Sequence, residues 1–301
     1  MAMAEHAGRA AAVPRGARLR LSPRLRRTLG RLAVNPTAWL GFAILGTVIG
    51  LAAFAPVLFP GDPLDMVAEP FVRPFVALAH PLGTDSLGRD VAAGIVHGAR
   101  ASLLVGFVAA LVGTLVGTAI GAVAGYRGGL VDDLLVRLTE LFQTIPSFIF
   151  LVVLVAIVPP KAVWVALAIG IVSWPTVARL VRAEFRSLRR RDFVLAARSV
   201  GHSASHIVLR EILPNALPAI IVTGSVMVAS AILLESALSF LGMGDPDVVS
   251  WGAMIGSGRE QLRTAWYLTA LPGAAIVVTV LALNLVGDAL NDALNPRLED
   301  R

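Results

Sequence analysis

Few side chains in this sequence could perform chemistry. His202 and His206 stand four residues apart, a spacing that places two imidazoles on one helix face, where they could share a metal ion. No third ligand stands nearby, and the chain contains no cysteine that could act as a nucleophile. The single lysine, Lys161, follows two prolines rather than a glycine-rich phosphate loop. We therefore expect no catalytic residue, no metal site and no cofactor bound by this chain.

Three carboxylic acids stand near the ends of apolar runs: Glu140, Glu235 and Asp288. An ionisable group inside a membrane is a candidate for moving protons or ions, so each could have a direct role in transport. At the end of a run, water or a neighbouring loop can also satisfy the charge. A carrier driven by an ion gradient would show charges at mid-membrane and an inverted internal repeat, and this sequence shows neither.

The elements that must position these groups are strongly apolar. Hydrophobic residues make up 56% of the 301 residues and charged residues only 15%, which excludes an ordinary soluble domain. Charge-free runs near or above the roughly 20 residues needed to cross a bilayer are continuous rather than alternating, which favours helices over a barrel. The sequence predicts an all-α polytopic membrane protein with six spans: Leu32–Gly61, Ala101–Tyr126, Leu141–Pro160, Ala162–Ala178, Ile212–Leu234 and Thr264–Gly287.

Positive charge predicts the orientation of these spans. Basic residues cluster at Arg9–Arg31, before the first span, and at Arg179–Arg210, between the fourth and fifth spans. The positive-inside rule places both clusters in the cytoplasm, and six spans then place both termini there. The net charge of +6 follows from this topology and from attraction to anionic membrane lipid, not from binding to nucleic acid.

The chain is expected to divide into three parts. Residues 1–30 are predicted to form a disordered basic cytoplasmic tail, and residues 31–90 a first transmembrane helix followed by an extracytoplasmic segment. The first apolar run is too long for a signal peptide and lacks a clear cleavage site, so we expect it to be retained. Residues 91–301 are predicted to form the transport domain.

Small residues and a proline mark two of the predicted spans. Gly113, Gly117, Gly121 and Gly125 share one face of the second span, where they would let another helix approach closely. That neighbour could belong to this subunit, to another subunit or to the transport path. Pro175 predicts a kink in the fourth span, with either a structural or a gating role.

The segment from Asp192 to Asn215 is polar, flanked by arginines and helix-prone, although apolar runs lie on both sides of it. A cytoplasmic segment of this kind is typical of a surface offered to a soluble partner. A loop lying on lipid would show a continuous apolar face, whereas the small residues Ala196, Ala197 and Gly201 favour seating in a groove of a partner. Because the chain has no energy-converting motif, we expect a soluble ATPase to act on this segment.

The spacing of Ala196, Ala197, Gly201, Leu213 and Pro214 is similar to the EAA loop of binding-protein-dependent ABC importer permeases. The sequence resembles in particular the C-type subunits of the dipeptide, oligopeptide and nickel branch. Leu195 departs from that pattern, because an acidic residue usually stands there; Asp192 or Glu211 could replace its contact. Four further segments resemble this branch: His80–Asp90, Gly125–Gly129 with Asp132, Leu238–Gly242 with Ser250–Gly252, and Asn284–Pro296.

The resemblance implies a type I ABC importer core of five helices plus one peripheral N-terminal helix, with a coupling loop at residues 182–215. It implies a heterodimer with a B-type permease subunit, two cytoplasmic ATP-binding subunits and an extracytoplasmic solute-binding protein. ATP and Mg would bind to the ATPase subunits, so this chain is not expected to be an enzyme. The expected location is the prokaryotic plasma (inner) membrane, and the expected cargo is a di- or oligopeptide. Nickel or glutathione as cargo, or a self-contained secondary carrier, are the alternatives.

A last segment, from Trp251 to Arg263, could form an amphipathic helix outside the membrane. Trp251, Met254 and Ile255 stand among polar residues there. We therefore expect Trp251, Arg259 and Arg263 to contact the solute-binding protein.

Overall fold

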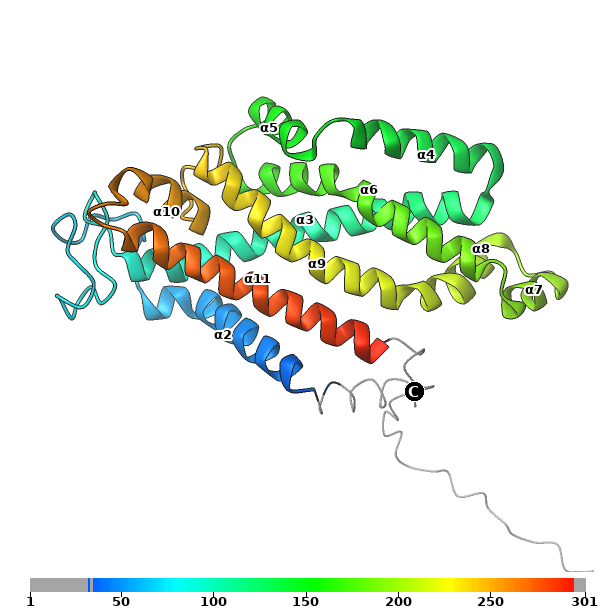
Figure 1. The fold of residues 1–301 in the computed structure, drawn as a ribbon, viewed down its shortest axis with the longest axis horizontal. Coiled ribbons are helices and arrows are strands. Elements are labelled where there is room, and N and C mark those ends of the chain that lie inside the picture. The colour runs from blue at the N-terminus through cyan, green and yellow to red at the C-terminus, as the bar shows by residue number, and fades with distance from the viewer. Residues whose placement is uncertain (1–31, 33–34, 295–301) are drawn as a thin grey trace, which may run out of the picture.

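The computed structural model describes residue 32 and residues 35–294, and the expected tail at residues 1–30 lies outside this range. Five long helices lie alongside one another in an elongated bundle (Figure 1). A short helix, α10 (Trp251–Gly258), lies at one end and another, α7 (Asp192–Ser199), at the other; we call these the α10 end and the α7 end. The long helices are α2 (Pro36–Leu58), α3 (Val91–Arg127), α6 (Ala162–Leu188), α9 (Leu213–Phe240) and α11 (Tyr267–Leu294).

Shorter elements connect these helices. α4 (Gly129–Thr144) and α5 (Ser147–Ile157) join α3 to α6. Between α7 and α9 the chain forms α8 (Ala204–His206) and a π-helical turn, η1 (Ile207–Ile212). A 3₁₀ turn, η2 (Arg259–Gln261), follows α10. The described residues contain no β-strand, so the prediction of an all-α membrane fold is confirmed.

The third predicted span differs from the expectation. α4 and α5 meet at an angle of 83°, and α5 has only 11 residues, about 16 Å of helix against about 30 Å of hydrocarbon. The break lies at Ile145 and Pro146, because proline disfavours helical backbone in the residue before it, and Ile145 is extended (φ −87°, ψ 129°). The third span expected at Leu141–Pro160 is therefore not one continuous helix. The described residues contain five helices long and apolar enough to cross a membrane, and six spans if the bent pair counts as one.

The glycine ladder packs α3 directly against α6. A Cβ atom on Gly117 would lie 2.6 Å from the Cβ of Val177, and one on Gly121 would lie 2.4 Å from the carbonyl oxygen of Ala178. Gly125 meets Arg182 and Phe185 in the same way. The two backbones thus approach closely along several helical turns. Of the alternatives open from the sequence, packing within this subunit is the one observed.

Two further helices bear on the sequence predictions: α2 matches its prediction, whereas the kink predicted at Pro175 does not interrupt α6. α2 buries only small residues, while Phe54 and Val57 on its outer side are exposed, so it is the peripheral helix that was predicted. α6 continues through Pro175 as a single helix, with the proline buried.

The segment between α2 and α3 has no regular structure, yet it is tied down by polar contacts. The hydroxyl of Thr84 is fully buried and donates to the Glu69 carbonyl at 2.6 Å. The hydroxyl of Tyr267, at the start of α11, lies 2.9 Å from the Thr84 carbonyl and 3.1 Å from that of Val72. Asp90 caps α3 by accepting from the Ala92 amide at 2.7 Å. These bonds hold the segment against the α10 end.

Candidate functional site

The α7 end contains the segment that the sequence analysis proposed for docking. α7 terminates in a Schellman motif, in which the amide of Gly201 donates to the Arg198 carbonyl at 2.9 Å and that of His202 donates to the Ala197 carbonyl at 3.1 Å. This turn requires left-handed backbone at Gly201, which has φ +85°. A Cβ atom there would meet nothing within 4 Å. The glycine is therefore needed for the shape of the turn, and not for close packing within this chain.

The two alanines of the motif have different environments. Ala197 is buried beside Val194 in a core cluster that includes Phe185 and Ile212. Ala196 is exposed. We correct the expectation for Ala197: it anchors α7 to its own subunit, because its side chain faces the core and a partner cannot reach it.

α7 exposes apolar side chains among polar ones, Asp192, Arg198 and Ser199 being exposed as well. The side chains of Phe193 and Leu195 are 39% and 48% exposed, and Val200 just beyond the helix is 78% exposed. Phe193 and Val200 are seven residues apart and lie on the same side, whereas Leu195 lies on another side of the helix. These exposed apolar side chains are available for contact with a protein partner.

The docking segment is joined rigidly to a membrane span. α8, η1 and α9 form one continuous helical run from Ala204 to Phe240. Ser203 caps this run by accepting from the His206 amide at 3.3 Å. Leu213 and Pro214, expected to end a loop, instead lie inside this helical run, directly after the π-helical turn η1. The segment after the turn that follows α7 is thus continuous with the helix α9.

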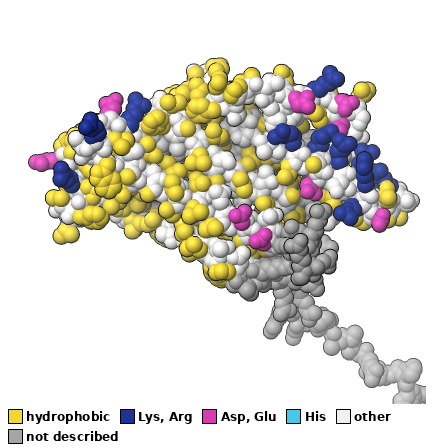
Figure 2. All heavy atoms as spheres, in the orientation of Figure 1, with side chains coloured by type: hydrophobic (Ala, Val, Ile, Leu, Met, Phe, Trp, Pro, Cys, Tyr) yellow, Lys and Arg dark blue, Asp and Glu magenta, His cyan; other side chains and the backbone are white. Residues whose placement is uncertain are grey.

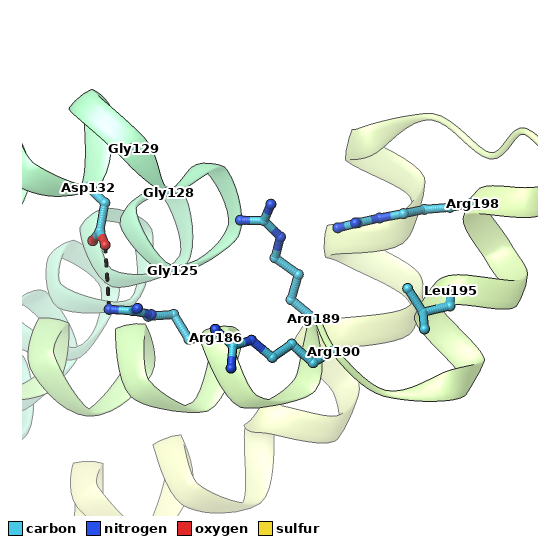
Figure 3. A pocket seen from close by; sticks show the side chains of 9 residues that line it. All are labelled: Gly125, Gly128, Gly129, Asp132, Arg186, Arg189, Arg190, Leu195 and Arg198. Atoms are coloured by element: carbon cyan, nitrogen blue, oxygen red, sulfur yellow. Dashed lines mark ion pairs between the residues drawn. The ribbon is translucent and has the colours of Figure 1, made fainter.

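Asp132 connects the turn between α3 and α4 to α6. Its side chain is almost completely buried and accepts two hydrogen bonds from the Arg182 guanidinium, the one from Nη2 at 2.8 Å. Arg186 lies 3.7 Å away on the same helix (Figure 3). Arg189 donates to the Arg127 carbonyl at 3.3 Å. A bidentate pair of this kind fixes geometry as well as charge.

The remaining polar candidates differ in burial. Glu235 is buried within α9 and accepts hydrogen bonds from three serine hydroxyls, those of Ser239 at 2.7 Å, Ser102 at 3.4 Å and Ser236 at 3.5 Å. Glu140 and Asp288 are exposed. The rings of His202 and His206 stack 4.2 Å apart, and among the described residues no three potential ligands come together in a metal site.

The geometry of the α7 end can be compared with known proteins. A family model described as "binding-protein-dependent transport system inner membrane component" matches residues 117–300, which include the whole docking segment.

The chain belongs to this family.

Curated relatives match this permease over most of their length. The probable peptide ABC transporter permease protein y4tQ of Sinorhizobium fredii is 42% identical over 93% of this chain and 96% of its own. The oligopeptide transport system permease protein OppC of Escherichia coli is 40% identical over 89% of each chain. The di/tripeptide transport system permease protein DppC of Pseudomonas aeruginosa is 36% identical over 89% of this chain and 90% of its own.

The fold of the permease is also known from solved structures. A chain of the MetNI methionine ABC transporter, in an inward-facing conformation, superposes with a TM-score of 0.56 at 18% identity. The match covers 67% of this chain and 96% of that one. At this identity the likeness concerns the fold alone. The permease is therefore an inner membrane transport component with the membrane-subunit fold of an ABC transporter.

At the α10 end, the expected contact of Trp251 with a binding protein is contradicted by the structure. Trp251 was expected to contact a binding protein, but its side chain is only 1% exposed and its indole Nε1 donates to the Ile95 carbonyl at 2.9 Å. It packs α10 against α3 and is inaccessible to a partner. Arg259 and Arg263 are exposed and remain candidates for such a contact.

A second polar contact at this end connects two loops. The carboxylate of Asp245 accepts from the amide of Ala162 at 2.9 Å and so caps α6 from outside its own sequence. Lys161 forms an ion pair with Asp247. The hydrogen bond to Asp247, and then the nearby charge of Asp245, raise the pKa of Lys161.

Proposed function

We propose that this permease is the C-type membrane subunit of an ATP-driven importer of di- or oligopeptides. It would form the translocation path with a B-type permease subunit and work with two cytoplasmic ATP-binding subunits and an extracytoplasmic solute-binding protein. The names of the three relatives described above, each a permease protein for peptides, support the cargo class. ATP and Mg would be held by the ATPase subunits.

The observation that carries the coupling mechanism is the continuous helical run from Ala204 to Phe240. The ATPases would grip the surface formed by Phe193, Leu195, Ala196 and Val200, with Gly201 shaping the turn beside it. Because α7 is anchored by Val194 and Ala197 to the base of α6 and α9, movement of this surface would tilt both helices together. A rigid-body movement of this kind opens a path alternately to either side.

The distribution of charge supports the orientation. Arginine side chains gather at the α7 end of the molecule (Figure 2), which includes most of the basic cluster at residues 179–210. The positive-inside rule assigns that end to the cytoplasm. The α10 end, with Arg259 and Arg263, would then face the binding protein.

Docking is tested by placing a charge on the outward face of α7. Leu195→Arg should abolish co-purification of the ATPase subunits, because a desolvated charge would be buried in an apolar contact. Leu262→Arg is the matched control, since Leu262 is similarly exposed, at 53%, but lies at the α10 end. If both variants retain the ATPases equally, the docking surface is misassigned.

Energy source and cargo require a second experiment. The transporter reconstituted in vesicles with its binding protein should accumulate labelled dipeptide when ATP is supplied to the ATPase side. Uptake driven by a proton gradient without ATP would instead identify a secondary carrier. Competition by nickel or glutathione, rather than by unlabelled peptides, would assign one of the alternative cargos.

A further inference from the structure

A pocket at the α7 end adjoins the proposed docking surface, because Leu195 is one of the residues that line it. It lies between the turn that joins α3 to α4, the last turns of α6, and α7 (Figure 3). Its volume is about 450 Å³, within the range of small-ligand sites. Four arginines line it: Arg186, Arg189, Arg190 and Arg198. Arg189 and Arg198 extend toward each other across the pocket, and their guanidinium carbons lie 6.0 and 5.7 Å from the centre of the Tyr126 ring.

The positive charge in this pocket is not balanced. Asp132 is its single lining carboxylate, and it is already engaged by Arg182 and Arg186. Within residues 35–294, no carboxylate forms an ion pair with any of the other three lining arginines. The N-terminus of α4 also opens here at Gly128 and Gly129, with no side chain capping its amides, and it adds partial positive charge. Such a site is complementary to an anion with several acceptor oxygens.

The surroundings of the pocket indicate an amphiphilic ligand. α4 starts at the pocket and carries a stripe of exposed leucines on one face, formed by Leu130, Leu134, Leu138 and Leu141. Leu130, nearest the pocket, is 87% exposed. A soluble anion would make no use of this stripe, whereas acyl chains could lie along it.

We propose that this pocket binds the phosphate group of an anionic phospholipid, with the acyl chains following the leucine stripe of α4. Guanidinium groups bind phosphate oxygens in pairs, and basic pockets between membrane helices suit acidic headgroups. The site joins the α3–α4 turn to α7, so a bound lipid would brace the docking surface. This inference depends neither on the cargo nor on the energy source.

The assembled transporter in detergent tests the proposal with a fluorescent phosphatidylglycerol probe, against a phosphatidylcholine probe of equal chain length. The double variant Arg189→Gln with Arg198→Gln should bind phosphatidylglycerol about 30-fold more weakly, because each arginine near a headgroup contributes about fivefold. The double lysine variant at these positions should retain most of the binding, which separates loss of charge from misfolding. Arg210→Gln, an exposed arginine of η1 outside the pocket, should bind like the wild type.

The other outcomes are equally informative. Displacement of the probe by inorganic phosphate, but not by chloride at equal ionic strength, would keep the phosphate site and assign its source to the free ion. If inorganic phosphate does not displace the probe, the bound phosphate group belongs to a lipid. Unchanged phosphatidylglycerol binding in the double glutamine variant, or equal binding of both probes, overturns the proposal. The proposal is also overturned if the double glutamine variant loses the ATPase subunits but binds the probe normally. The two arginines would then pair with carboxylates of the ATPase subunits.

Discussion

Single residues at the α7 end show that one sequence motif combines different physical roles. Gly201 supplies a backbone conformation, Ala197 fills a core position, and Ala196 with Leu195 faces outward. Leu195 replaces the acidic residue expected there, so the contact it offers is apolar. The proposed docking surface would therefore depend more on shape and hydrophobic contact than on a salt bridge at that position.

Replacement of Gly201 by alanine should destabilise the turn after α7 by about 1–2 kcal/mol, because a Cβ atom disfavours left-handed backbone. Gly201→Asn should cost less, since asparagine tolerates this conformation. Proteolysis at the α7 end, followed over time, measures the local opening. Equal protection of the alanine and asparagine variants would show that backbone strain is not the reason for this glycine.

The buried carboxyl of Glu235 should contribute to stability through its serine partners. Glu235→Leu would leave the hydroxyls of Ser102 and Ser239 without an acceptor, at a cost of about 1–3 kcal/mol, seen as a lower unfolding temperature of the purified transporter. Glu235→Gln keeps an acceptor oxygen and should behave nearly like the wild type. If Glu235 had a direct role in ion movement, the glutamine variant would instead be as stable as the wild type but inactive in transport.

At the level of elements, the closest association is between α3 and α6. Small residues let backbone atoms of one helix lie against backbone atoms of the other. Backbone atoms cannot move aside as a flexible side chain can, so an added side chain would not be accommodated there. α4 and α5, by contrast, are separated by the break at Pro146 and expose apolar residues such as Leu134 and Ile149. The first pair is a rigid core, while the second offers an apolar surface to lipid or to another subunit.

Gly121→Val should destabilise the α3–α6 pair by about 1–3 kcal/mol, because its Cβ would overlap the carbonyl oxygen of Ala178. Gly50→Val on α2 is the control, since nothing lies within 4 Å of a Cβ atom at Gly50. Thermal unfolding of both purified variants makes the comparison. A similar loss in both would point to helix propensity rather than to packing.

The whole molecule is an elongated helical bundle with one candidate contact surface at each end. The segment at residues 60–90 is hydrogen-bonded to α3 and α11 at the α10 end, while α7 packs through apolar side chains against α6 and α9 at the other. The long helices run between the two ends of the bundle. Transport would then require that movement at one end reaches the other.

Insertion of two glycines between Ile212 and Leu213 should uncouple the two ends, because it interrupts the helical run from Ala204 to Phe240. The ATPase subunits should still co-purify and hydrolyse ATP, but peptide uptake into vesicles should fall to background. The same insertion after Gly61, in an exposed loop, should leave uptake intact. Normal uptake with the first insertion would refute a rigid connection.

The sequence by itself determined the class of this protein, because membrane spans depend on local hydrophobicity and the docking motif on local spacing. It also placed Gly113, Gly117, Gly121 and Gly125 on one face, since helical periodicity is a local property. Only the tertiary structure decided which helix meets that face, that Trp251 and Ala197 are buried, and that Asp132 pairs with Arg182 fifty residues away. These outcomes depend on contacts between distant segments, which no periodicity within a segment records. The arginine pocket arises in the same way, from three elements that are separate in the sequence.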